Sequence, residues 1–87
     1  DSFAPNTGML FDFGKDGDWR IWMYRMRFDI DIAWLAKDGR IITIKQNAKP
    51  GEYPETYRAD SPSWYVIEVP AGTFTKENIG QGDTLAL

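Results

Sequence analysis

The first residues whose types and spacing could do chemistry are two carboxylates in the middle of the chain. Asp29 and Asp31 lie in the stretch Phe28–Leu35, where Phe, Ile, Ile and Trp occupy every second position. A period of two is typical of a β-strand, so both carboxylates should project from one face. Such a pair could hold Mg²⁺ or Ca²⁺, or act as an acid and a base. The competing interpretation is structural, with Asp29 solvated and Asp31 accepting hydrogen bonds that fix a bend.

A third carboxylate, Glu68, stands in the apolar stretch Trp64–Val69. If Glu68 faced the same cavity as Asp31, the two groups could form an acid–base couple whose pKa values are pushed apart. The protein would then be a carboxylate-based, hydrolase-like enzyme, with or without a divalent metal. The simpler interpretation places Glu68 at an exposed position of a strand.

The chain contains neither histidine nor cysteine. It therefore lacks Ser-His and Cys-His nucleophile pairs, an imidazole that titrates near neutral pH, and the usual ligands of a zinc site. No motif requires a cofactor. These absences favour a non-enzymatic role and leave Asp31 and Glu68 as the catalytic candidates, and Asp29 and Asp31 as the metal candidates.

Aromatic side chains beside an arginine form the other kind of candidate site. Trp22, Tyr24 and Arg25 could line a pocket for a sugar ring, a peptide or a flat ligand. Alternatively, these side chains fill the core, as one face of their strand must. Trp22 lies on the face opposite Ile21 and Met23. All three side chains can be buried only if other parts of the protein cover both faces of the strand.

Arginines interleaved with aromatic residues, at Arg20, Arg25 and Arg27, could also bind single-stranded nucleic acid. The net charge of −3 and the pI near 4.7 argue against this, because domains that bind the phosphate backbone are usually basic. No apolar run approaches the roughly 20 residues of a membrane-spanning helix. Nucleic acid is therefore a disfavoured partner, and this chain predicts no membrane span.

These candidates must be positioned by a small, mostly β (α+β) domain. We expect a small curved antiparallel sheet or a barrel-like fold, with one short helix before the last strand. The pattern predicts strands at 8–13, 28–35, 41–46, 64–69 and 83–87, with a bend at 24–27 and a helical turn within 73–81 capped by Thr73 or Thr75.

Two connections are also predicted. Asp38-Gly39 indicates a hairpin with a type I′ turn between the second and third of these strands. The proline-rich segment 47–63 predicts a connection without regular structure. Long connections of this kind in small domains often cover a functional site.

Six short blocks occur in a characteristic order, as GMLF at 8–11, WM at 22–23, DIAWL at 31–35, DGR at 38–40, YVIEVPAG at 65–72 and GD at 82–83. In this order the chain resembles, over nearly its whole length, the domain of unknown function 192 family of small bacterial and archaeal proteins. The resemblance implies a compact, mostly β fold and matches Asp31 to the aspartate of the family pattern. It also implies that members are often exported or tethered to a membrane, and it implies no agreed activity.

The sequence departs from the family pattern in two places. The family usually begins with a further strand and a Gly-Leu-Met-x-Arg block, to which nothing here corresponds. We therefore expect residues 1–87 to form one domain that lacks this N-terminal strand. After WM the family commonly has Lys-Asn or Lys-Gly, whereas this chain has Tyr24-Arg25, so a ligand contact made by that lysine does not carry over.

The combined expectation is a non-enzymatic ligand-binding or accessory module. Its site would lie near Trp22, Tyr24, Arg25 and Asp31 beneath the segment 47–63, and its ligand would be a small molecule, a sugar or a peptide. One alternative is the carboxylate-based enzyme. Another is an assembly module that adds a strand to a partner, because a missing N-terminal strand would leave an open sheet edge.

Overall fold

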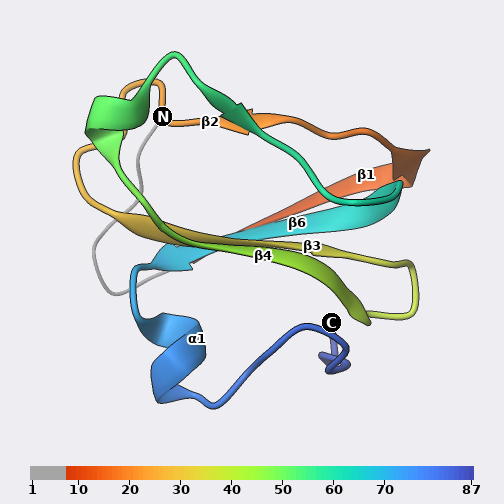
Figure 1. Cartoon of the computed structure of the whole chain (residues 1–87). Helices are drawn as coiled ribbons and strands as arrows, with labels where there is room; N and C mark the ends of the chain where they lie inside the picture. Colours follow the sequence, from red (N-terminus) through yellow and green to blue (C-terminus); the bar gives the residue numbers. More distant parts are fainter. Residues whose placement is uncertain (1–7) are drawn as a thin grey trace.

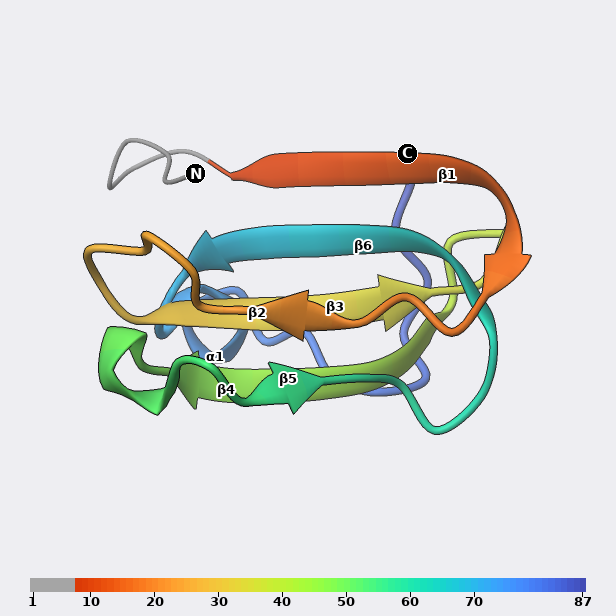
Figure 2. The same cartoon turned by 90° about the horizontal axis from the view of Figure 1, so that it is seen from above.

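The computed structural model describes residues 8–87, and its central element is a four-stranded antiparallel sheet. The strands lie in the order β1 (Met9–Gly17), β6 (Ser63–Pro70), β3 (Ile30–Leu35) and β4 (Ile41–Ala48) (Figures 1 and 2). The predicted mostly β fold is confirmed. Within residues 8–87 the sheet ends at β1 and β4 and is not closed, so the barrel-like alternative is wrong.

Strand β3 lies at the centre of the packing because both of its faces are covered. All six of its residues are buried, although they alternate between two clusters. Ile30, Ile32 and Trp34 belong to one cluster, and Ala33 and Leu35 belong to the other. The predicted alternation is therefore confirmed, and each face is apolar because each meets its own layer of the molecule.

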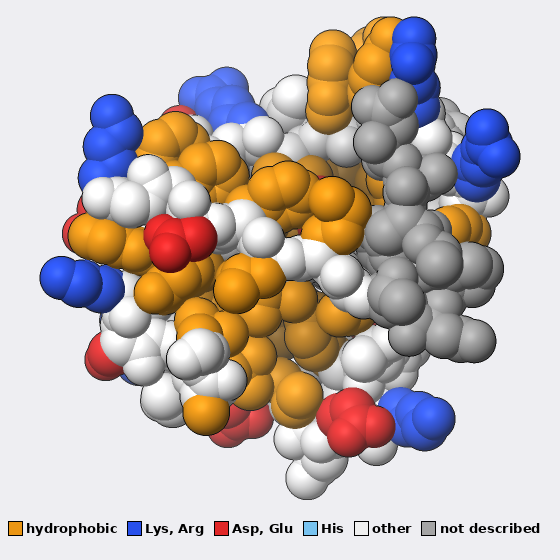
Figure 3. Space-filling model, turned by 180° about the vertical axis from the view of Figure 1, so that it is seen from behind, with side chains coloured by type: hydrophobic (Ala, Val, Ile, Leu, Met, Phe, Trp, Pro, Cys, Tyr) orange, Lys and Arg blue, Asp and Glu red, His pale blue; other side chains and the backbone are white. Residues whose placement is uncertain are grey.

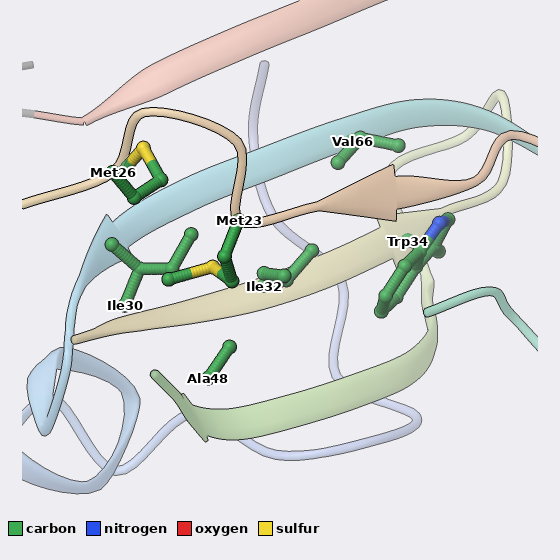
Figure 4. Close-up of a cluster of buried hydrophobic side chains, with 7 residues drawn as sticks. All are labelled: Met23, Met26, Ile30, Ile32, Trp34, Ala48 and Val66. Atoms are coloured by element: carbon green, nitrogen blue, oxygen red, sulfur yellow. The ribbon is translucent and has the colours of Figure 1, made fainter. Parts of the chain in front are cut away.

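A two-stranded ribbon covers the first face. It consists of β2 (Ile21–Trp22) paired with β5 (Thr56–Tyr57), and in Figure 2 it lies over the sheet. Below it, the fully buried Met23 points from the segment after β2 into the cluster of Ile30, Ile32 and Trp34 (Figure 4). The flexible thioether chain suits this space between ribbon and sheet.

The segment 47–63 is not without regular structure, contrary to the sequence-based expectation. It contains the 3-10 helix η1 (Pro50–Glu52) and β5. The Tyr57 hydroxyl donates a hydrogen bond to the Glu52 carboxylate, which ties these two elements together. Tyr57 also packs against the first cluster, so the segment is held to the body by hydrophobic contact.

The helix α1 (Thr73–Lys76) and the C-terminal segment cover the second face (Figure 1). The predicted helical turn is confirmed, but its N-cap is Gly72 at φ 90° rather than a threonine. The predicted strand 83–87 is reduced to a single bridge between Arg40 and Thr84. Gly82 turns the chain at φ 92° immediately before this bridge, and the bridge is flanked by hydrogen bonds from the Ile41 N–H to the Asp83 oxygen at 2.7 Å and from the Leu85 N–H to the Gly39 oxygen at 2.9 Å.

The hairpin between β3 and β4 is confirmed, but its turn is not of type I′. A type I′ turn requires positive φ at both central residues, and here only Gly39, at φ 91°, has it. The Gly39 N–H donates to the Ala36 carbonyl oxygen at 2.9 Å, and the Ala36 N–H donates to the Arg40 oxygen at 2.8 Å. The Asp38 carboxylate accepts the Arg40 N–H at 3.0 Å, which favours this alternative turn.

Candidate functional site

A cavity of about 290 Å³ lies between the sheet and the ribbon, on the side of the edge strand β1. The sheet contributes β1 and β6, and the other wall comes from the chain on either side of β2. The lining residues are Met9, Phe11, Glu68, Arg20, Ile21, Trp22, Tyr24 and Met26. The walls are therefore mostly apolar or aromatic, with one acidic and one basic side chain.

The strand register places Glu68 in this cavity. Glu68 pairs with Met9 of β1 and with Ile32 of β3, so its side chain shares their face of the sheet. Only 7% of Glu68 is exposed, so the expectation of an exposed strand position is wrong. Burial raises the pKa of the Glu68 carboxyl above the ordinary value of 4.5, and the positive charge of the chain's N-terminal amino group opposes this shift in part.

Trp22, Tyr24 and Tyr53 form an exposed group that we call the aromatic cluster. The Trp22 ring centroid lies 5.2 Å from that of Tyr24 and 5.3 Å from that of Tyr53, and the tyrosine centroids are 5.5 Å apart. Their exposed fractions are 47%, 39% and 44%. Since the adjacent Met23 is buried in the core, Trp22 projects outward, and the cluster borders the cavity through Trp22 and Tyr24.

Two arginines surround this region. The Arg25 guanidinium lies 5.1 Å from the centre of the Tyr24 ring, a cation–π distance, but Arg25 does not line the cavity. Arg20 does line it, and its guanidinium pairs with the Asp18 carboxylate at 3.2 Å. The basic charge at the cavity wall is therefore balanced by an acidic neighbour.

Asp31 lies on the opposite face of the sheet and is fully buried. Its Oδ1 accepts the N–H of Asn47 at 3.0 Å, and its Oδ2 accepts the N–H groups of Gly72 at 3.0 Å and Phe74 at 3.4 Å. Asn47 lies in an irregularity of β4, at φ 55°. The carboxylate thus joins a bulged strand to the first turn of α1, which is the structural role considered from the sequence.

The predicted pairings of carboxylates are not formed. Asp31 pairs in register with Val69 rather than Glu68, so Asp31 and Glu68 point to opposite faces and do not share a cavity. Asp29 instead forms an ion pair with Lys49 at 3.0 Å, with both side chains well exposed. Within residues 8–87 no group of three or more acidic, histidine or cysteine side chains is placed to hold a metal ion.

The structure therefore brings together Trp22, Tyr24 and Glu68, with Arg25 beside them, and separates Asp29 and Asp31 from them. Tyr53 was missed as a member of the site because nothing local in the sequence links it to Trp22. The pairing of Trp22 with Thr56 brings the two segments together. None of the helices in residues 8–87 is long and apolar enough to cross a membrane.

A family model, DUF192, described as "Uncharacterized ACR", matches residues 1–87. Among solved structures, a candidate transcription regulator from Sinorhizobium meliloti 1021 superposes with a TM-score of 0.88 at 37% identity, covering 97% of this chain and 64% of the other. A protein of unknown function from Novosphingobium aromaticivorans DSM 12444 has a TM-score of 0.86 at 25% identity, covering 98% and 60%. This chain thus spans less than two thirds of either protein. No curated protein matches it.

Proposed function

Because the chain belongs to the DUF192 family, whose description assigns no activity, we propose a function from the site itself. The protein is a ligand-binding module whose cavity receives a small molecule between β1, β6 and the ribbon. Trp22 and Tyr24 contact the apolar or ring-shaped body of the ligand, and Glu68 contacts a polar group. The observation that carries the proposal is the buried carboxylate of Glu68 in the wall of a cavity that Trp22 and Tyr24 also line.

The proposal is supported by the free-energy cost of such a group. Burial removes water from the Glu68 carboxylate, and this desolvation disfavours its ionised form in the folded state. Groups that are costly for folding are found preferentially at functional sites. The cavity volume of about 290 Å³ is close to the lower end of small-molecule sites, roughly 300 to 1,000 Å³.

The aromatic cluster supports the same assignment. Large exposed rings provide hydrophobic surface that a partner or ligand can bury. From behind, on the side of β1, hydrophobic side chains spread across the face, and Lys and Arg side chains stand mainly toward its rim (Figure 3). Trp22 lines the cavity and its ring centroid lies 5.3 Å from that of Tyr53, so a ligand in the cavity can extend onto the aromatic cluster.

The two alternatives stated from the sequence have less support. A couple of Asp31 and Glu68 would need both carboxylates in one cavity, whereas they face opposite sides of the sheet. Strand addition would use an edge of the sheet, at β1 or at β4. The register of β1 shifts between Asp12 and Gly17, and Lys15 and Asp16 lie exposed there, features that disfavour pairing of β1 with another strand.

The first prediction concerns the tryptophan signals in an NMR titration. When a panel of sugars, short peptides and small aromatic compounds is added to the ¹⁵N-labelled protein, we expect a ligand to shift the Trp22 indole resonance. The fully buried Trp34 indole, which donates to the Trp19 carbonyl oxygen at 2.7 Å, should stay unchanged. Trp22→Ala should weaken binding by roughly tenfold, because it removes a large contact surface.

Leu10→Ala is the matched control. Leu10 is 51% exposed and lies between Met9 and Phe11, but it points away from the cavity that both of these line. This variant should bind as the wild type does. The proposal fails if no compound in the panel shifts Trp22 and the neighbouring amides, or if Leu10→Ala weakens binding as much as Trp22→Ala.

A further inference from the structure

We propose that the ligand of this cavity is a neutral sugar, with its ring against Trp22 and Tyr24 and its hydroxyl groups bonded to Glu68 and Arg20. This inference rests on the proposed function and names the class of compound that the same site takes. It follows from the balance of charge in the cavity, from its polar side chains and from the arrangement of the aromatic cluster.

The charges at the cavity are balanced, which favours a neutral ligand. Glu68 is the acidic side chain of the wall, and the positive amino group at the N-terminus of the chain acts on it. Arg20 is the basic side chain, and the Asp18 carboxylate pairs with it at 3.2 Å. A charged ligand would therefore gain little attraction from either wall, and it would lose its own hydration on entering.

The two polar side chains suit hydroxyl groups, which both donate and accept hydrogen bonds. A carboxylate offers roughly four acceptor positions, so Glu68 can accept a ligand hydroxyl beside any other partner. The Arg20 guanidinium donates to the Asp18 carboxylate from Nε at 3.3 Å and from one terminal nitrogen at 3.2 Å, and a guanidinium has further N–H donors. A ligand with several hydroxyl groups can thus bond to both walls. A wholly apolar ligand would dehydrate both side chains without replacing their hydrogen bonds to water.

The aromatic cluster provides an apolar surface for the sugar ring itself. The C–H groups on the face of a pyranose ring carry a small positive charge, and the face of an aromatic ring is negative. Trp22 and Tyr24 are stacked at an interplanar angle of 26°, and Tyr53 lies against both. Since the three rings hold one another in place, they lose little conformational freedom when a ligand binds.

The test compares three neutral compounds by NMR titration into the full chain. Methyl β-glucopyranoside has both a ring and several hydroxyl groups, phenethyl alcohol has a ring with a single hydroxyl group, and sorbitol has hydroxyl groups without a ring. We expect the glucoside to shift the Trp22 indole resonance and to bind at least about fivefold more tightly than either of the others.

The preference for a neutral sugar is tested on the same ring. Methyl β-glucuronide carries a carboxylate, and methyl β-glucosaminide carries an ammonium group. Both should bind more weakly than the glucoside, and tighter binding of either one would overturn the inference. These comparisons use the wild type, so they stand even if a variant of Glu68 does not fold.

Glu68→Leu and Glu68→Gln form a matched pair of variants. Both new side chains are close in size to glutamate, but only glutamine keeps hydrogen-bonding groups for a hydroxyl. We expect Glu68→Leu to weaken binding of the glucoside by roughly tenfold, and Glu68→Gln to weaken it by at most about threefold. Equal binding of the glucoside by the two variants would overturn the inference.

The remaining outcomes separate the two proposals. Equal or tighter binding of phenethyl alcohol at Trp22 overturns the choice of a sugar and leaves the ligand-binding function standing. Equal binding of sorbitol also overturns it, because the ring would then not be recognised. If neither these compounds nor the wider panel shifts Trp22, the ligand-binding function fails together with the inference.

Discussion

At the scale of residues, two buried carboxylates on adjacent strands have opposite surroundings. Asp31 accepts three backbone N–H groups, whereas Glu68 lies in the wall of a cavity, where burial raises its pKa. Hydrogen bonds to a buried carboxylate stabilise the fold, whereas desolvation of an ionised carboxylate opposes folding. We therefore propose a structural role for Asp31, which the sequence left open beside a role in the site, and a role in the site for Glu68.

The role of Asp31 predicts a large effect of Asp31→Asn on thermal stability. An amide has one acceptor oxygen instead of two, so at least one of the three N–H groups loses its acceptor. We expect a loss of about 2 kcal/mol in the free energy of unfolding. This corresponds to a fall of roughly 8–16 °C in Tm for a domain of this size.

Asp29→Asn is the matched control, because Asp29 is 41% exposed and pairs with the exposed Lys49. An exposed ion pair contributes about 1 kcal/mol or less, so this variant should melt close to the wild type. If Asp31→Asn melted as high as the wild type, the hydrogen bonds to β4 and α1 would not be important for stability.

At the scale of elements, the β3–β4 hairpin depends on close contact with the C-terminal segment. The Leu85 N–H donates to the Gly39 carbonyl oxygen at 2.9 Å. A Cβ on residue 39 would overlap the Leu85 carbonyl oxygen. The glycine is thus required both by its positive φ and by this contact.

Gly39→Ala should therefore destabilise the protein by about 2 kcal/mol or more, since it adds backbone strain to a steric overlap. Chemical denaturation would measure this loss. Gly51→Ala is the control, because Gly51 in η1 has no atom within 4 Å of the added Cβ and no positive φ. A similar loss in both variants would contradict the explanation.

Some of these elements could be predicted from local signals in the sequence, and others could not. The alternation in β3 and the Asp38-Gly39 pair are local signals, and they correctly predicted a strand and a hairpin. The ribbon could not be predicted, because each of its strands is two residues long and pairs with a distant segment. Because the ribbon forms one wall of the cavity and brings Trp22 to Tyr53, neither feature could be predicted from the sequence.

The orientation of the carboxylates was unpredictable for a related reason. Periodicity assigns a residue to a face of its own strand, but only the register between strands relates two strands to each other. Asp31 and Glu68 were therefore correctly placed on strands, and their separation required the pairing of Ile32 with Glu68.

At the scale of the whole molecule, the burial of Glu68 predicts how stability depends on pH. The pKa of Glu68 is raised in the folded state above its ordinary value of 4.5. The folded state therefore binds the proton more tightly, so this contribution to stability is full below about pH 4.5 and is lost as pH rises through the raised pKa.

Glu68→Gln should remove the loss of stability that accompanies ionisation of Glu68 as pH rises. We expect the variant to melt higher than the wild type at neutral pH, with a smaller difference in acid, when Tm is measured from about pH 4 to about pH 8. The other charged groups, Arg20 included, are common to both proteins, so the difference between the curves reports on Glu68. A lower Tm for the variant at neutral pH would mean that the folded state stabilises the ionised carboxylate, and it would contradict the expected effect of burial.

The division of the molecule into a sheet and a ribbon has a consequence for how the protein can evolve. Strands β2 and β5 of the ribbon form two residue pairs, whereas β3 and β6 of the sheet form six. The exposed rings of Trp22, Tyr24 and Tyr53 lie on or beside the ribbon, and Glu68 lies in the sheet. Under the proposed function, substitutions among the rings should therefore alter the preferred ligand at little cost to folding. Related proteins could then diverge in the compounds that they recognise while keeping the same scaffold.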